Sequence, residues 1–173
     1  MSRKGIGNSP AASAFGDIQA GCVRAQPAMH IARTISGLGA DPEQVLAGAG
    51  IPADLFANPE NTISLQALGN LLERCVAATG CEHFGLLLGA AADDNPLGLL
   101  GEIIEQCADV GTAIAHIHQY FHVHDRGGMA TRTVAGRDAS IGYALLDATG
   151  PGVDLYYDAA LADVISFTPR LSC

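Results

Sequence analysis

The sequence lacks any hydrophobic run of membrane-spanning length. No stretch approaches the roughly 18 uninterrupted apolar residues that a transmembrane helix needs. Arg3 and Lys4, near the start, are not followed by an apolar segment, so the pattern of a secretory signal is missing as well. Both absences lead us to expect a cytoplasmic protein without a membrane partner.

The cysteines show no pattern of pairing. Their number is odd and none has Cys-x-x-Cys spacing, which argues against a disulfide framework and against a structural zinc site. Free cysteines usually pack as small hydrophobic side chains, so we expect free, buried thiols, with an accessible thiol at the last position. The cysteines are Cys22, Cys75, Cys81, Cys107 and Cys173.

Positive charge is scarce. The formal net charge is −9, while 49% of the residues are hydrophobic and 16% are charged, which is typical of a folded domain. Between Asp41 and Asp109 the only Lys or Arg is Arg74. Non-specific DNA affinity comes from cations that replace the counterions of phosphates, so we expect no direct nucleic-acid binding by this chain. The carboxylates of this stretch are Asp41, Glu43, Asp54, Glu60, Glu73, Glu82, Asp93, Asp94, Glu102, Glu105 and Asp109.

Recognisable catalytic motifs are absent too, and we expect that the protein is not an enzyme. No Gly-x-Ser-x-Gly elbow or activated-cysteine context accompanies its serines, histidines and aspartates. The glycine-containing stretches 84–89 and 97–101 lack the Lys-Ser/Thr pair of a phosphate loop and the strand-then-helix context of a dinucleotide site. Glycine inside an apolar helix usually marks close packing, which is the favoured interpretation here.

Apolar periodicity predicts helices over most of the chain. Residues 1–27 show no sustained period and are expected to form a flexible leader, and residues 28–173 a single domain. The Asp-Pro-Glu sequence at 41–43 is a strong helix start, and Ser64 is a good cap for a helix with a leucine stripe. The helices predicted in this part are 28–38, 42–48, 65–79, 83–92, 96–107 and 110–122.

After the Gly-Gly pair 127–128 the apolar period changes to that of strands. Residues 129–134 and 140–146 predict two strands joined by a turn at 135–138. Residues 154–167 are expected to be helical again. The order of helices, hairpin and helix predicts an α+β fold, with a multi-helix body followed by a small antiparallel sheet and a C-terminal helix.

Four histidines lie close together, at positions 116, 118, 122 and 124. His118 and His122 are four residues apart and share a helix face, a spacing at which two imidazoles can bind zinc. His116 lies about 200° around the helix from His118 and cannot join them, and no His-Glu-x-x-His frame is present. A histidine-rich helix end, favoured by the helix dipole, is the simplest interpretation. A metal or haem site and pH-sensitive or ligand-contacting histidines are the alternatives, and we expect no cofactor.

Residues 30–52 have the outline of a helix-turn-helix, because two short predicted helices are joined by a glycine-containing turn. A recognition helix reads base edges with Arg, Lys, Asn or Gln. The second helix offers only Glu43 and Gln44, without a cation. DNA recognition through this segment is therefore not expected.

An ordered series of short segments resembles one protein family. The segments are 36–42 (SGLGADP), 46–51 (LAGAGI), 63–65 (ISL), 79–80 (TG), 84–89 (FGLLLG) and 97–101 (LGLLG). Together they resemble the N-terminal arabinose-binding-type domain of AraC-family transcription regulators, over about residues 28 to 170. The order of the segments carries the resemblance, since each one is short.

The resemblance implies a sensor domain. In that family the N-terminal domain senses a small molecule and dimerises, and a C-terminal domain with two helix-turn-helix motifs binds promoters. We therefore expect a small-molecule effector, a homodimer, and DNA contact only through a C-terminal domain of full-length relatives. Neither that domain nor the last strands of the sensor are found before Cys173.

A small-molecule site is expected where the helices meet the hairpin. Residues there combine hydrogen-bond donors, one fixed cation and two aromatic rings beside apolar neighbours. Family membership does not name the ligand, and a ligand-free protein–protein interaction module is the alternative. The predicted ligand-binding residues are His118, Tyr120, His122, Arg126 and Tyr143.

Overall fold

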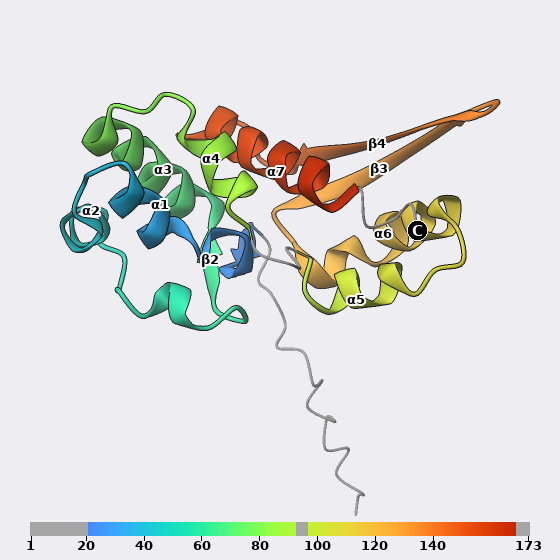
Figure 1. Cartoon of the computed structure of the whole chain (residues 1–173), viewed down its shortest axis with the longest axis horizontal. Coiled ribbons are helices and arrows are strands. Elements are labelled where there is room, and N and C mark those ends of the chain that lie inside the picture. Colours follow the sequence, from blue (N-terminus) through green and yellow to red (C-terminus); the bar gives the residue numbers. More distant parts are fainter. Residues whose placement is uncertain (1–20, 93–96, 169–173) are drawn as a thin grey trace, which may run out of the picture.

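The computed structural model describes residues 21–92 and 97–168, which form helices and two small antiparallel sheets, as expected for an α+β fold (Figure 1). In chain order the elements are β1 (Cys22–Arg24), the 3-10 helix η1 (Gln26–Ala28), α1 (Ile31–Gly37), α2 (Pro42–Gly48), the 3-10 helix η2 (Leu55–Ala57), β2 (Thr62–Ser64), α3 (Leu65–Thr79), α4 (Phe84–Ala90), α5 (Leu99–Glu105), α6 (Val110–His124), β3 (Gly128–Ala135), β4 (Asp138–Leu145) and α7 (Val153–Phe167).

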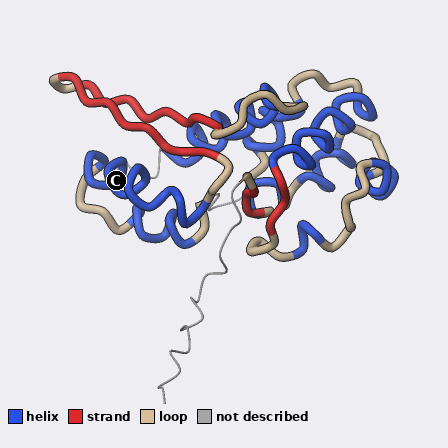
Figure 2. Tube along the Cα trace, turned by 180° about the vertical axis from the view of Figure 1, so that it is seen from behind, coloured by secondary structure: helices blue, strands red, loops and turns tan. Residues whose placement is uncertain are grey.

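The elements are arranged as two groups that α7 connects. Helices α1 to α4 lie on one side of the molecule, and α5, α6 and the β3–β4 hairpin lie on the other (Figures 1 and 2). α7 follows the hairpin in sequence but returns to pack against α4 and α3. Among the described residues, none of the helices has the length and apolar content needed to cross a membrane.

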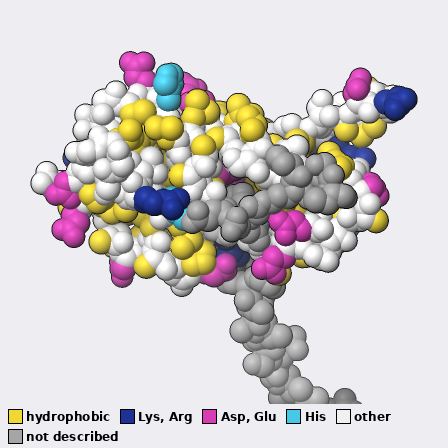
Figure 3. Space-filling view, in the orientation of Figure 1, with side chains coloured by type: hydrophobic (Ala, Val, Ile, Leu, Met, Phe, Trp, Pro, Cys, Tyr) yellow, Lys and Arg dark blue, Asp and Glu magenta, His cyan; other side chains and the backbone are white. Residues whose placement is uncertain are grey.

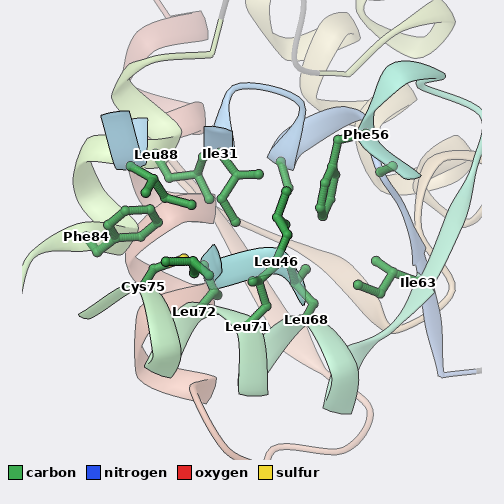
Figure 4. Packing of buried hydrophobic residues seen from close by; sticks show 14 of the residues in the cluster. Ile31, Leu46, Phe56, Ile63, Leu68, Leu71, Leu72, Cys75, Phe84 and Leu88 are labelled. Carbon is green, nitrogen blue, oxygen red and sulfur yellow. The ribbon is translucent and has the colours of Figure 1, made fainter. Parts of the chain in front are cut away.

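The first hydrophobic core lies among α1 to α4 (Figure 4). The predicted leucine stripe of α3 faces inward, and Leu71, Leu72 and Cys75 are fully buried. Phe84 of α4 and Ile31 of α1 close this core from the other side. Burial of one such aliphatic or aromatic side chain contributes roughly 1.5–3 kcal/mol, so this core accounts for much of the stability of the helical group.

The predicted helix starts are confirmed by their hydrogen bonds. The side chain of Asp41 accepts a hydrogen bond from the amide of Glu43 at 2.9 Å, and Ser64 accepts one from the amide of Ala67 at 3.1 Å. These bonds satisfy amides that have no partner inside the helix, which is the function of a cap. Gly80 ends α3 in the left-handed conformation with φ 67°, which glycine adopts at no steric cost.

α4 and α7 pack so closely that two glycines of α4 are required at the contact. A Cβ atom on Gly85 would lie 2.1 Å from the carbonyl oxygen of Leu155, and one on Gly89 would lie 2.2 Å from that of Ala159. The obstructing atoms belong to the backbone of α7 and cannot rotate away. The packing interpretation of the segment 84–89 is therefore confirmed.

The second hydrophobic core joins α5, α6, the base of the hairpin and the end of α7. Leu100 and Ile104 of α5 pack with Ile117 of α6 and Ala130 of β3, and Phe167 of α7 completes the cluster. β3 and β4 pair in register from Gly128 opposite Leu145 to Ala135 opposite Asp138, slightly longer than predicted. The distal half of the hairpin projects away from the helices, and Val134 there is 54% exposed (Figure 2).

The predicted leader is wrong at its C-terminal end. Residues 22–24 form β1, which pairs antiparallel with β2 through Val23 opposite Ile63, and Val23 and Ala25 are buried in the first core. A three-residue strand is too short to show a period of its own, and its partner lies about 40 residues away in the sequence, so local patterning gives no signal for it. Residues 1–20 lie outside the described residues.

The remaining helix predictions hold with shifted ends. α6 extends to His124, two residues beyond the predicted end, and α4 and α5 are shorter than predicted, with the expected start at Pro96 outside the described residues. Cys75 is buried, and burial raises the pKa of its thiol to about 12, so it stays protonated. The other described cysteines are free and half-buried, and Cys173 lies outside the described residues.

Candidate functional site

A buried carboxylate stands where α6 ends and the hairpin begins. Asp125 is 4% exposed, and its Oδ1 accepts hydrogen bonds from the amides of Gly127 at 2.6 Å and Gly128 at 3.2 Å. Its Oδ2 accepts a hydrogen bond from the hydroxyl of Tyr143 on β4 at 2.5 Å and a longer one from Tyr156 on α7 at 3.4 Å. We call these five residues the Asp125 cluster. It connects the end of α6, both hairpin strands and α7 through one side chain.

Aromatic rings surround the carboxylate. The ring of Tyr143 lies edge-on to Phe121 of α6 at 5.5 Å and to Tyr157 of α7 at 6.2 Å, and it is tilted toward Tyr156 at 6.0 Å. The hydroxyl of Tyr157 also accepts a hydrogen bond from the amide of Leu145 at 3.1 Å. Aromatic rings with inward-facing hydroxyls provide both apolar area and hydrogen-bonding groups, which are the surfaces that small-molecule sites use.

The electrostatics of the cluster keep the tyrosines neutral. Burial, together with the nearby negative charge of Asp125, raises the pKa of Tyr143 far above its usual value, and the pKa of Tyr156 is raised for the same reasons. Burial also raises the pKa of Asp125, although the hydrogen bonds from Tyr143 and the two glycine amides oppose this effect. Both hydroxyls therefore remain hydrogen-bond donors to the carboxylate at neutral pH.

A second polar group lies next to the cluster on the side of β1. Arg24 is 6% exposed, forms an ion pair with Glu60, and donates two hydrogen bonds of 3.4 Å to the carbonyl of Val123. Burial and the charge of Arg24 lower the pKa of His124 to about 4, so His124 is neutral at pH 7. An isolated β-bridge between Val23 and Asp125 places this group directly beside the cluster.

The space next to this second group is small. A crevice of about 30 Å³ opens between β1, the end of α6 and α5, room for roughly one water molecule. Its lining residues include Arg24, Glu60, Leu100 and His124. A broader and shallower hollow lies over the outer face of α5, beside Leu99 and Ile103.

The structure brings one of the five predicted ligand-binding residues into a buried cluster, Tyr143. His118 is exposed, but its Nδ1 donates a hydrogen bond to the carbonyl of Ala130 at 2.9 Å and so attaches α6 to β3. Tyr120 lies edge-on to His116 at 5.7 Å, on a part of α6 away from the hairpin, and His122 and Arg126 are exposed.

The predicted site omitted several polar residues that the structure buries at least in part. Asp125, Tyr156 and Tyr157 were not among the candidates, nor was Asp163 of α7, a partly buried aspartate whose Oδ1 is fully buried and has no hydrogen-bond partner. A signal existed only for Asp125, which stands two residues before a Gly-Gly pair, where a carboxylate can cap the amides of a turn.

The histidine-rich end of α6 lies outside any cluster of metal ligands in the described part of the chain. Over residues 21–92 and 97–168, no three His, Cys, Asp or Glu side chains come together as metal ligands would. The nearest arrangement is a pair, with the Sγ of Cys107 3.3 Å from the Nδ1 of His116. His118, one of the two histidines with zinc spacing, uses its Nδ1 for Ala130.

Comparison with known proteins identifies one family. The sequence model of the arabinose-binding domain of AraC transcription regulators, an N-terminal domain, matches residues 39–172. This range covers the helices from α2 onward, the hairpin and α7, and therefore includes the whole Asp125 cluster. No curated protein matches the chain at a significant level.

Proposed function

Because the chain belongs to the family of N-terminal arabinose-binding domains of AraC transcription regulators, we propose that it senses a small-molecule effector in the cytoplasm and passes the signal on by dimerising or by contacting a DNA-binding domain. The family match itself supports a ligand-binding regulatory domain, and the family is regulatory rather than enzymatic.

The observation that carries the proposal is the position of the Asp125 cluster. The cluster lies where α6, the hairpin, α7 and β1 meet, so a molecule bound there contacts both groups of helices at once. A ligand shifts the equilibrium between two conformations only if it binds one of them more tightly than the other. A molecule bound at this junction would contact four segments, so a change in how the segments pack would change its affinity. We propose Tyr143 as the innermost contact and His118, His122 and Arg126 as outer contacts. Tyr120, with its ring against His116, is the weakest of the five.

A thermal-shift experiment tests effector binding. The full chain is heated with L-arabinose, other monosaccharides, amino acids and organic acids in turn, and one class is expected to raise Tm. A ligand at about 100 times its Kd adds about 2.7 kcal/mol, which corresponds to several degrees for a domain of this size. Tyr143→Phe is expected to reduce the shift and Tyr120→Phe to leave it. If no probe raises Tm, the ligand-free interaction module is favoured instead.

Dimerisation is proposed from the outer face of α7. The exposed side chains near its C-terminal end are apolar: Leu161 and Ile165 are 56% and 63% exposed, with Val164 beside them. Contiguous exposed apolar side chains often mark a protein–protein interface. Figure 3 shows hydrophobic side chains gathered over α4 and α7. A second copy of the chain that covers this face would bury it.

Sedimentation velocity of the full chain tests the dimer. We expect a dimer at micromolar concentration that becomes monomeric when Leu161 and Ile165 are both changed to Glu, because two charges placed in an apolar interface must be desolvated without partners. The matched control is Val134→Glu, which changes an equally exposed residue on the hairpin and is expected to leave the dimer intact. A monomeric wild-type chain would contradict the proposal.

A further inference from the structure

A thiol and an imidazole lie within hydrogen-bonding distance where α5 leads into α6. The Sγ of Cys107 is 3.3 Å from the Nδ1 of His116, and α5 and α6 lie side by side (Figure 1). In the tautomer that carries its proton on Nε2, His116 accepts a hydrogen bond from this thiol. A cysteine with a base at this distance is the arrangement in which a thiol nucleophile is activated.

The imidazole is held in place by a neighbour on its own helix. The ring of Tyr120, one turn further along α6, lies edge-on to the ring of His116, with the ring centroids 5.7 Å apart. His116 is also half-buried, which limits its movement further. A base with a restricted orientation stays close to the proton that it has to accept, and this favours proton transfer.

The other described cysteines have different surroundings. Cys75 is fully buried, whereas Cys22 and Cys81 are half-buried like Cys107. Over residues 21–92 and 97–168, Cys107 alone has an imidazole within hydrogen-bonding distance of its thiol. All four are free thiols of one chain. Cys22 and Cys81 therefore report how fast a half-buried thiol reacts without a base, and Cys75 reports whether the fold opens.

The surface beside the thiol is apolar and carries negative charge. Leu99 and Ile103 are 46% and 43% exposed and line the shallow hollow over the outer face of α5. The Sγ of Cys107 makes a solvent-exposed contact of 3.7 Å with the carbonyl oxygen of Ile103, so the thiol lies beside this lining. Glu102 and Glu105 line the same hollow and disfavour an anion there. A neutral molecule with an apolar part therefore suits this surface.

We propose that Cys107 is a covalent modification site for neutral, apolar electrophiles of the α,β-unsaturated carbonyl class. His116 acts as the base, and the hollow over α5 receives the apolar part of the molecule. The site lies at the start of α6, whereas the Asp125 cluster lies at its end, so the inference does not depend on the effector proposed there.

The addition balances without a further reagent. The proton of the Cys107 thiol passes to the Nδ1 of His116 as the sulfur forms a bond to the β carbon of the double bond. The π electrons move toward the carbonyl oxygen to give an enolate, and the imidazolium returns the proton to the α carbon. The product is a thioether, and neither an oxidant nor a leaving group takes part.

The test follows each cysteine of the full chain separately. The protein is incubated at neutral pH with N-ethylmaleimide or with 3-maleimidopropionate, which share one reactive ring and differ in charge. Mass spectrometry of peptides gives the modified fraction of each thiol with time. We expect Cys107 to react with the neutral probe about tenfold faster than Cys22 and Cys81. Its preference for the neutral over the anionic probe is also expected to exceed theirs, because of Glu102 and Glu105.

Variants separate the effect of the base from that of exposure. His116→Gln is expected to slow the reaction of Cys107 about tenfold or more and to leave the rates of Cys22 and Cys81 unchanged. The control makes the same chemical change at an exposed histidine, as His83→Gln, and is expected to leave the rate of Cys107 unchanged. If the rate of Cys75 shows that His116→Gln opens the fold, His116→Phe replaces it, because phenylalanine keeps the ring contact with Tyr120 but has no basic nitrogen.

Three outcomes overturn the inference. One is that Cys107 reacts with N-ethylmaleimide no faster than Cys22 and Cys81. Another is that the folded His116 variants react at Cys107 as fast as the wild-type chain does. The third is that hydrogen peroxide oxidises Cys107 in preference to the other thiols while the maleimides do not distinguish them, in which case the site responds to an oxidant and the electrophile assignment is wrong.

Discussion

Alanine at both Gly85 and Gly89 is expected to destabilise the protein by about 2–5 kcal/mol, a large part of the stability of a domain of this size. The new Cβ atoms would lie 2.1 Å and 2.2 Å from carbonyl oxygens of α7, far inside contact distance. Because those oxygens belong to the helix backbone, the two helices have to separate, and the apolar contacts between them are lost. The cost exceeds the gain in helix propensity, which is about 1 kcal/mol for each glycine replaced.

Urea denaturation followed by circular dichroism measures this effect, and Gly37→Ala provides the control. Gly37 is also a helical glycine, in α1, but no atom lies within 4 Å of the position of its missing Cβ and its φ is not positive. Alanine there is expected to stabilise the protein slightly. The two changes should therefore have opposite signs, although both replace a helical glycine by alanine. Equal stabilisation by both would contradict the close α4–α7 contact.

The order of the elements could be predicted from the sequence because it depends on local signals. The caps Asp41 and Ser64 and the leucine stripe of α3 are properties of neighbouring residues, and the structure confirms them. The change from helical to alternating period after 127–128 located the hairpin for the same reason. The glycines of α4 were correctly assigned to packing, but their partner could not be named, since α7 lies about 70 residues further along the chain.

What the sequence could not provide is the set of contacts between distant segments. β1 owes its existence to β2, and the burial of Arg24 follows from that pairing and from Glu60. Asp163 looks like any surface aspartate of a helix until α7 is placed against the hairpin and the second core. The site predicted where helix meets hairpin consisted of polar residues that lie close to this junction in the sequence, such as His122 and Arg126. The buried contacts come instead from α7, which local patterns do not connect to that region.

Removal of the Asp125 carboxylate is the second change for which we expect a large effect. Asp125→Ala leaves the buried amides of Gly127 and Gly128 and the hydroxyls of Tyr143 and Tyr156 without their acceptor. Each unsatisfied buried donor costs about 1–3 kcal/mol, and partial relaxation or an entering water recovers some of it. A net loss of about 3–5 kcal/mol is expected, which for a domain of this size lowers Tm by roughly 8–15 °C.

Comparison with two other variants identifies the cause of this loss. Asp147→Ala removes a carboxylate that accepts similar local hydrogen bonds, from the amide and the hydroxyl of Thr149. Asp147 is fully exposed, so water replaces these hydrogen bonds and Tm should hardly change. Tyr143→Phe removes only one donor to Asp125 and should cost less than Asp125→Ala. If the Asp125 side chain holds α6, the hairpin and α7 together, Asp125→Ala destabilises the protein most, Tyr143→Phe less, and Asp147→Ala least. If Asp147→Ala were as harmful as Asp125→Ala, the loss would come from turn geometry, and the cluster would not connect the two halves of the molecule.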